Sequence, residues 1–270
     1  MNRLSLLVPV LFLAAHPLRA QTSLVPPGAH AGAPGTLIQL NDFGSGDIAY
    51  FSIPETPPKG GVIVLHDQWG MGDRIKAVVD RLADAGYIAV APDLFNGQVP
   101  ADADRAAGMA RDLARDSAFR TVAATVRFLR ESPRFRCARI VVVGWGMGAG
   151  LAWEAAVPGK DKVWINGAAA IGTPAGVDWN ELARAPQPLL GLFDPAFPAG
   201  FRPALDAALA GRKNVELRDL PAGPPPAQVW PALLAFLDRA MSAPASENFL
   251  DRVNPFKPAA QAVPAALPAP

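Results

Sequence analysis

The sequence predicts an α/β fold, with a mostly parallel central sheet that is covered by helices on both faces. Short apolar runs alternate with longer amphipathic segments, which is the pattern of repeated strand–helix–strand units. One run, Gly60–Leu65, is apolar throughout, as expected for a strand that is buried on both faces of a parallel sheet. The chain has 270 residues, of which 50% are hydrophobic, so it is long enough for one large domain with a substantial core.

The first 20 residues have the features of a secretory signal peptide. Arg3 gives a basic start, Leu4–Ala15 is apolar, and Leu18-Arg19-Ala20 precedes a predicted cleavage after Ala20. The apolar run is broken by Pro9 and is short for a membrane span, which needs about 20 apolar residues, although an uncleaved anchor is the alternative. We therefore expect a secreted or periplasmic protein with no membrane span in the mature chain.

Segments rich in proline flank the predicted domain, which we place at residues 35–241. Residues 21–34 contain mainly Pro, Gly, Ala and His and are expected to form a flexible lead-in. Residues 242–270 are rich in Pro and Ala, which predicts a disordered tail.

The overall charge excludes some kinds of partner. A formal net charge of +1 gives no electrostatic reason to expect nucleic acid or an acidic membrane. Cys137 is the single cysteine, so no internal disulfide is possible and stability must come from core packing. The sequence does not determine an oligomeric state.

The domain is predicted to open with a β-hairpin followed by a strand–helix–strand unit. The hairpin strands are Thr36–Leu40 and Asp47–Ile53, joined by a turn at Asn41–Gly46. After the strand Gly60–Leu65, we expect Asp73 to be the N-cap of a helix at Arg74–Ala85, which Gly86 ends. The next strand is Tyr87–Ala91.

The alternation continues to the end of the domain and predicts right-handed crossovers between parallel strands. The remaining strands are predicted at Ile140–Val143, Val163–Ile171, Pro188–Phe193 and Val215–Leu220. The remaining helices are predicted at Ala101–Arg115, Ser117–Arg130, Met147–Ala156, Pro203–Ala210 and Ala227–Met241.

Four alternating glycines follow the strand Ile140–Val143, in the sequence RIVVVGWGMGAG at residues 139–150. This pattern indicates a strand, a very tight turn and a closely packed helix. One site with this pattern is the nucleophile elbow, G-x-Nuc-x-G, in which Gly146 takes the place of the nucleophile. The other is the dinucleotide fingerprint, G-x-G-x-x-G/A, matched by Gly144, Gly146 and Ala149.

The dinucleotide interpretation fits the chain less well. The fingerprint normally follows an early strand and is followed about 20 positions later by a carboxylate. Here several strands precede it, and the next strand ends at Ala168–Ile171 without a carboxylate. Trp145 would also crowd a pyrophosphate. A dinucleotide-binding protein is therefore the lesser alternative.

Several polar and aromatic residues fall at the predicted carboxyl ends of the strands, where open α/β sheets bind ligands. They are Asp67, Gln68, Trp69, Asp93, Trp145, Gly146, Met147, Thr173 and Asp194. Three carboxylates and two tryptophans along one edge predict a small-molecule pocket. The alternative is that Asp67 and Asp93 cap the following helices and that both tryptophans pack in the core. No metal-ligand spacing links the three aspartates, so we predict neither a metal nor a cofactor.

Three segments between Gly35 and Arg239 resemble the dienelactone hydrolase family. Residues 60–97 contain an apolar strand, an acidic corner, a helix ending in L-A-x-x-G-Y and a strand ending in P-D-L-F. Residues 139–150 resemble the family's elbow, G-F-C-M-G-G, and residues 188–198 resemble its acid-bearing segment, G-x-x-D-x-x-x-P. The resemblance implies the α/β-hydrolase fold and activity on carboxylic esters or lactones.

Carried over by position, the resemblance gives an incomplete catalytic triad. Asp194 matches the triad acid, and Asp67 falls where the family has a glutamate that interacts with the nucleophilic cysteine. The backbone N–H groups of Met147 and Gln68 would form the oxyanion hole. Gly146, at the nucleophile position, has no atom that can attack a carbonyl.

The triad histidine is also missing. The family has it after the last strand, where residues 220–226 here read LPAGPPP. The three histidines of the chain lie far upstream, at His16, His30 and His66.

No other side chain is expected to replace these groups. Cys137 precedes the elbow strand and should lie about 20 Å from Gly146, at the opposite edge of the sheet, as an inert thiol. Thr173 is on the correct edge but has no histidine beside it to act as base. His66 falls at a corner where the family tolerates a histidine without a catalytic role. Glycine at the elbow relaxes its strained backbone and leaves room in the pocket.

The sequence therefore predicts a secreted family protein that is non-catalytic or a very weak hydrolase. We expect it to keep a small-molecule pocket around Gly146, Trp145, Trp69, Asp67 and Asp194. The alternative is an active ester or lactone hydrolase with a non-standard catalytic apparatus, so the sequence leaves open whether the protein is an enzyme.

Overall fold

The computed structural model describes residues 34–157, 164–193, 200–221 and 226–242. The predicted signal peptide, nearly all of the lead-in and the tail beyond Ser242 lie outside the described residues, as does Asp194. Along the described ranges, no helix has the length and apolar character needed to cross a bilayer.

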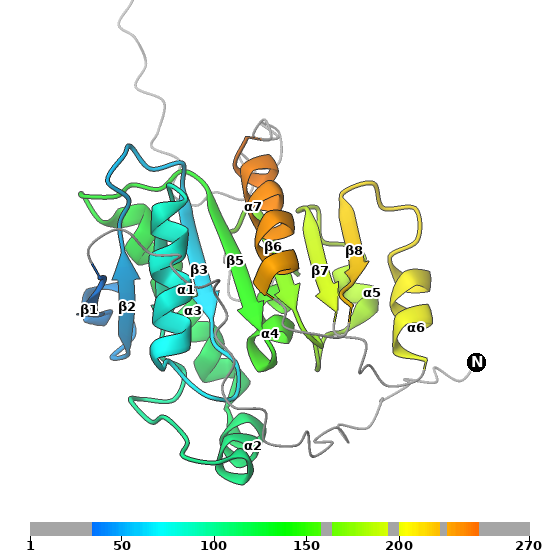
Figure 1. Ribbon diagram of the computed structural model, residues 1–270, viewed down its shortest axis with the longest axis horizontal. Helices are drawn as coiled ribbons and strands as arrows, with labels where there is room; N and C mark the ends of the chain where they lie inside the picture. Colours follow the sequence, from blue (N-terminus) through cyan, green and yellow to red (C-terminus); the bar gives the residue numbers. More distant parts are fainter. Residues whose placement is uncertain (1–33, 158–163, 194–199, 222–225, 243–270) are drawn as a thin grey trace, which may run out of the picture.

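An eight-stranded sheet runs through the molecule (Figure 1), with the strand order β1-β2-β4-β3-β5-β6-β7-β8. The pairs β1–β2 and β2–β4 are antiparallel, and the other five pairs are parallel, which confirms the predicted mostly parallel sheet. The strands are β1 (Thr36–Gln39), β2 (Ile48–Ser52), β3 (Gly61–Leu65), β4 (Ile88–Pro92), β5 (Ile140–Trp145), β6 (Gly167–Ile171), β7 (Leu189–Phe193) and β8 (Val215–Asp219).

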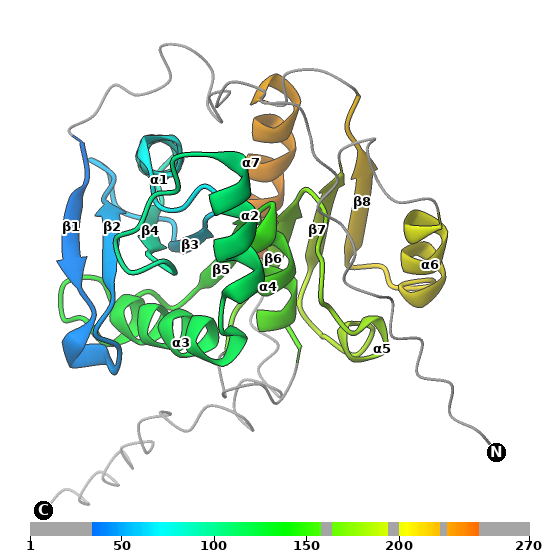
Figure 2. The same cartoon turned by 90° about the horizontal axis from the view of Figure 1, so that it is seen from below.

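Helices cover both faces of the sheet (Figure 2). The buried side chains of α1 and α7 pack on one face, and those of α3 and α4 pack on the other. The helices are α1 (Asp73–Asp84), α2 (Ala103–Asp112), α3 (Arg115–Glu131), α4 (Met147–Ala155), α5 (Trp179–Leu182), α6 (Phe201–Ala208) and α7 (Pro226–Ser242), with a short 3₁₀ turn at Asn41–Phe43.

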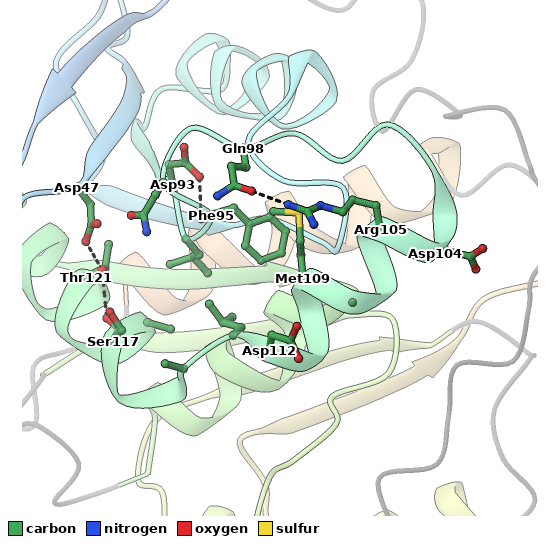
Figure 3. A pocket seen from close by; sticks show the side chains of 16 residues that line it. Asp47, Asp93, Phe95, Gln98, Asp104, Arg105, Met109, Asp112, Ser117 and Thr121 are labelled. Atoms are coloured by element: carbon green, nitrogen blue, oxygen red, sulfur yellow. Dashed lines mark hydrogen bonds between the residues drawn. The ribbon is translucent and has the colours of Figure 1, made fainter.

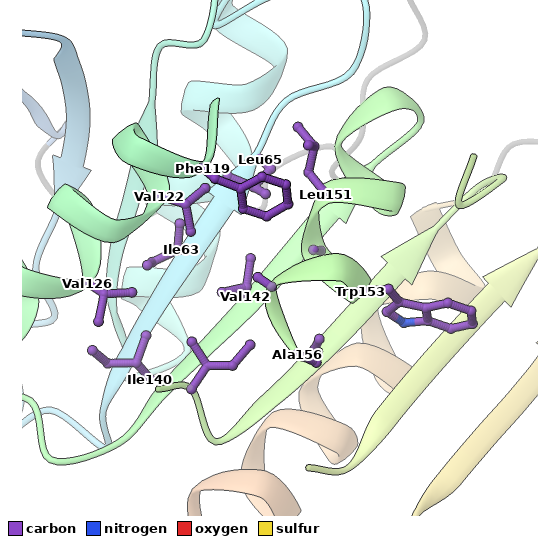
Figure 4. Close-up of a cluster of buried hydrophobic side chains, with 14 of the residues drawn as sticks. Ile63, Leu65, Phe119, Val122, Val126, Ile140, Val142, Leu151, Trp153 and Ala156 are labelled. Carbon is purple, nitrogen blue, oxygen red and sulfur yellow. The ribbon is translucent and has the colours of Figure 1, made fainter. Parts of the chain in front are cut away.

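Alternation along the central strands divides the core into two clusters. In β3, Ile63 and Leu65 face the α3 and α4 side, where they join Phe119 and Leu151 (Figure 4). Val62 and Val64 belong to the cluster on the α1 and α7 side. Successive side chains of a strand point to opposite faces, so an uninterrupted apolar run supplies both clusters at once.

Two predicted boundaries are wrong in an informative way. Gly72, with an extended backbone, is the N-cap of α1, and Asp73 is the first residue of the helix. The Asp73 carboxylate is exposed in the first turn, where the helix dipole favours a negative charge. The predicted helix at Ala101–Arg115 begins only at Ala103, because the Asp102 side chain accepts the backbone N–H of Arg105 at 2.8 Å and caps the helix there.

Candidate functional site

Gly146 forms the turn between β5 and α4. Its φ of +50° and ψ of −113° lie in a region that residues with a Cβ rarely adopt. The N–H of Gly146 donates to the carbonyl of Ile171 at 2.9 Å, which ties the turn to the end of β6. The predicted elbow is therefore present. Its backbone angles would strain a residue with a Cβ, and glycine adopts them without that strain.

The other glycines of the motif allow backbones to pack against each other. A Cβ on Gly144 would lie 1.9 Å from the carbonyl oxygen of Gly148, and one on Gly148 would lie 2.5 Å from that of Leu65. A Cβ on Gly150 would lie 2.1 Å from the carbonyl oxygen of Ala175. Because each glycine has a packing reason of its own, the motif does not need a bound phosphate to explain it.

The loops that follow β3 and β5 meet at the elbow. These strands are neighbours, with Leu65 paired to Gly144, so the residues just beyond them come together. A Cβ on Gly146 would lie 3.1 Å from the Cβ of Asp67 and 3.1 Å from Oε1 of Gln68. The two segments that should supply the oxyanion hole are therefore in contact.

Both predicted oxyanion donors have free N–H groups. Met147 is the first residue of α4, so its N–H has no carbonyl partner inside the helix. Neither this N–H nor that of Gln68 has a hydrogen-bond acceptor within the described ranges. Two free donors beside an elbow can bind a carbonyl oxygen, whether or not a nucleophile is present.

The Asp67 carboxylate is buried and fully engaged. One oxygen accepts the backbone N–H of Trp69 at 2.9 Å, and the other accepts the guanidinium of Arg74, in α1, at 3.1 Å. Asp67 thus holds its own loop and forms an ion pair, instead of capping α1. Arg74 was not among the residues that the sequence singled out, because a pair seven positions apart across a loop follows no periodic pattern.

His66 is 0% exposed and joins two loops. Its Nε2 accepts the backbone N–H of Leu94 at 3.0 Å, which leaves Nδ1 to donate to the carbonyl of Asp67 at 2.7 Å. The ring also packs edge-on against Phe95, with centroids 4.8 Å apart. Burial lowers the pKa of His66 and favours its neutral form. These contacts support a structural role for His66.

Asp93 holds the turn that follows β4. Its carboxylate accepts the backbone N–H groups of Phe95 and Gly97, and Asn96 and Gly97 both have a positive φ. The alternative that Asp93 caps the following helix is wrong, because its carboxylate holds a turn and α2 is capped by Asp102.

The predicted aromatic and hydroxyl groups differ in their surroundings. Trp145 is 5% exposed and belongs to the core cluster on the α1 and α7 side, so it is a packing residue. Trp69 and Thr173 are half-buried. Thr173 lies near the elbow, because a Cβ on the preceding Gly172 would be 3.4 Å from the Cα of Gly146.

A cavity of about 520 Å³ lies apart from the elbow, between the loop after β4, α2 and the start of α3 (Figure 3). Of the predicted site residues that the structure describes, only Asp93 lines it. Its polar side chains largely bond to one another: Arg105 donates to Gln98 at 3.0 Å, and Thr121 donates to Asp47. In the part of the chain that the structure describes, no group of three or more His, Cys, Asp or Glu residues is arranged to hold a metal ion.

Cys137 lies at the opposite edge of the sheet, as predicted. Its Sγ is 3.3 Å from the position of a Cβ on Gly61, the first residue of β3, whereas the elbow follows the last residue of β5. Burial raises the pKa of the Cys137 thiol to about 11, so it is protonated at neutral pH and unreactive.

Comparisons with known proteins agree with this architecture. The sequence model of the dienelactone hydrolase family matches residues 48–217. Carboxymethylenebutenolidase 1 of Cupriavidus pinatubonensis is 26% identical over 117 residues, which are 40% of this chain and 50% of that protein. The matched segments span about half or less of the curated relatives.

Solved structures show the same fold. A dienelactone hydrolase-like promiscuous phosphotriesterase from metagenomic libraries has a TM-score of 0.60 and 19% identity, over 77% of this chain and 99% of that one. A Thermus thermophilus protein has a TM-score of 0.56 and 15% identity, over 78% and 100% of the two chains. The predicted α/β-hydrolase fold is therefore confirmed.

Proposed function

The chain belongs to the dienelactone hydrolase family, and from this premise we propose that it binds a small molecule at the elbow and hydrolyses esters or lactones weakly or not at all. The observation that carries the proposal is Gly146. It stands at the turn where the family has its nucleophile, with the backbone of a nucleophile elbow but without a side chain. A covalent acyl intermediate requires an oxygen or sulfur at that position.

The surroundings of the elbow also support the loss of acyl transfer. His66 is the only histidine among the described residues, and both of its ring nitrogens are used to join two loops. The Asp67 carboxylate is held by Arg74 and the N–H of Trp69. Neither group is free to act as the base that an activated nucleophile or water needs.

The backbone donors at the elbow support ligand binding, which does not require a nucleophile. Beside Gly146, the N–H groups of Met147 and Gln68 have no hydrogen-bond acceptor among the described residues. In a hydrolase that lacks its triad, an oxyanion hole and a binding pocket still give about 10³–10⁴-fold catalysis over water. Weak esterase activity is therefore compatible with this proposal.

The test is hydrolysis of p-nitrophenyl acetate and dihydrocoumarin by the purified protein, beside an Asp194→Asn variant. We expect equal rates for both proteins, no more than about 10⁴-fold above the uncatalysed reaction. Rapid turnover by the wild type that Asp194→Asn abolishes would contradict the proposal. It would establish the alternative, an active hydrolase with a non-standard catalytic apparatus.

A further inference from the structure

The side chain of Gln68 is directed at the place where the family has its nucleophile. Its Oε1 lies 3.1 Å from the position that a Cβ on Gly146 would take. A contact this short is tighter than ordinary van der Waals packing, so any side chain at position 146 would compete with Gln68 for the same space. The Gln68 side chain, from the loop after β3, thus occupies space that a side chain at position 146 would need.

The Gln68 carboxamide has unused hydrogen-bonding capacity. Across the described residues, neither its oxygen nor its nitrogen has a hydrogen-bond partner, and the residue is half-buried. A carboxamide offers two N–H donors and a carbonyl acceptor, on a nitrogen and an oxygen that are bonded to the same carbon. A polar group that is partly withdrawn from water gains free energy when a partner replaces the lost water.

Among the residues that the structure describes, the polar groups around Gln68 are neutral or compensated. The charge of Asp67 is balanced by Arg74 at 3.1 Å. The nearby Thr173 hydroxyl and the free N–H of Met147 carry no formal charge. A carboxylate ligand would therefore lose its hydration here and approach a site whose neighbouring cation is already paired.

We propose that Gln68 stands in place of the missing nucleophile as the residue that contacts the ligand. The ligand class is then a neutral compound with a hydrogen-bond donor and an acceptor bonded to the same carbon, such as a primary amide, and not a carboxylate anion. Oε1 accepts the donor of the ligand, and Nε2 donates to its carbonyl, in a paired arrangement. This inference rests on the proposed ligand-binding function.

The experiment compares benzamide with benzoate, which share size and shape but differ in charge. Binding of each is measured by ligand-observed NMR titration to the full chain, to Gln68→Ala and to Gln68→Glu. We expect the wild type to bind benzamide at least tenfold more tightly than benzoate. Gln68→Glu loses the donor of the pair and should bind benzamide about five- to tenfold more weakly, and Gln68→Ala loses both hydrogen bonds and should bind it at least as weakly. Gln68→Glu keeps the length of the side chain, so its loss separates recognition from shape.

Gln98→Ala is the matched control, because Gln98 lines the cavity between α2 and α3 and not the elbow. It should bind benzamide as the wild type does. If the wild type binds either compound and Gln68→Ala binds it equally well, the role of Gln68 is overturned and the ligand-binding function stands. If the wild type binds neither compound, the inferred ligand class is overturned, whereas the proposed function is tested separately by the ester and lactone assay.

Discussion

Three glycines of the elbow motif, Gly144, Gly148 and Gly150, are explained by the nearest backbone atom of a neighbouring residue. Gly150 faces the carbonyl oxygen of Ala175, and a Cβ there would lie only 2.1 Å from it. Gly108, inside α2, has nothing within 4 Å of the same point. The two glycines therefore differ in what a single methyl group would do, although both lie inside a helix.

We predict opposite effects of alanine at these two positions. Gly150→Ala should destabilise the protein by about 2–3 kcal/mol, because a backbone carbonyl must move to admit the methyl group. Gly108→Ala should stabilise it by about 0.5–1 kcal/mol, because alanine favours the helix and meets no clash. Urea unfolding followed by circular dichroism gives both values, and equal effects would contradict this explanation of the motif.

At the level of elements, β3 and β4 are connected beyond the sheet by a buried histidine. His66 accepts from the loop after β4 and donates within the loop after β3. Burial lowers its pKa by more than the Asp67 carbonyl and the carboxylates of Asp67 and Asp93 raise it. The link between the two loops thus depends on an uncharged imidazole.

Acidification should reduce the contribution of His66 to the free energy of unfolding. The folded pKa of His66 lies below the unfolded value of about 6.5, so the unfolded chain binds the proton more readily. Its contribution is complete above pH 6.5 and is lost as the pH falls towards the folded pKa, at up to about 1.4 kcal/mol per pH unit. The measurement is urea unfolding between pH 7.5 and 5. His66→Gln should be less stable than the wild type at pH 7.5, and its free energy of unfolding should lack this dependence on pH. If the free energies of unfolding of the two proteins fall in parallel with pH, His66 does not titrate on unfolding.

The sequence predicted the elements well where burial imposes a pattern. The strands from β3 to β5, strand β7 and the helices α1, α3, α4 and α7 fall close to their predicted positions, because each buries an apolar run or stripe. Helix α5 was missed because four residues are too short to show a period. The start of α1 was misplaced because Gly72, which has no side chain to signal a cap, took the position expected for Asp73.

At the scale of the whole molecule, the two ends of the parallel strands carry chemically different groups. The elbow, Asp67 and Asp93 lie at the carboxyl ends of the strands, and Cys137 lies at the other edge. This division was predictable from chain direction alone. The partners of each side chain were not, because Arg74, Gln68 and the cavity beside Asp93 depend on loops that meet only in the folded chain.

Cys137 should report the unfolding of the entire domain. It is the only cysteine of the chain, is 7% exposed, and has a pKa raised to about 11 by burial. We expect its labelling by Ellman's reagent at pH 8 to be slow in buffer and to follow the circular dichroism transition in guanidinium chloride. In the control, Ala138→Cys combined with Cys137→Ala moves the thiol to an exposed neighbour and should label at once. Fast labelling of the native wild type would show that this edge opens locally.

The short distance between Gln68 and a Cβ at position 146 also affects how a catalytic residue could be introduced at the elbow. A serine or cysteine at position 146 must adopt a φ of +50° and place its Cβ 3.1 Å from both Asp67 and Gln68. It destabilises the elbow before any histidine is present to activate it. The first substitution towards catalysis would therefore lower the stability of the protein without giving activity. At this turn, glycine is therefore the residue that costs the folded protein least, and a nucleophile would have to offset its cost in stability through catalysis.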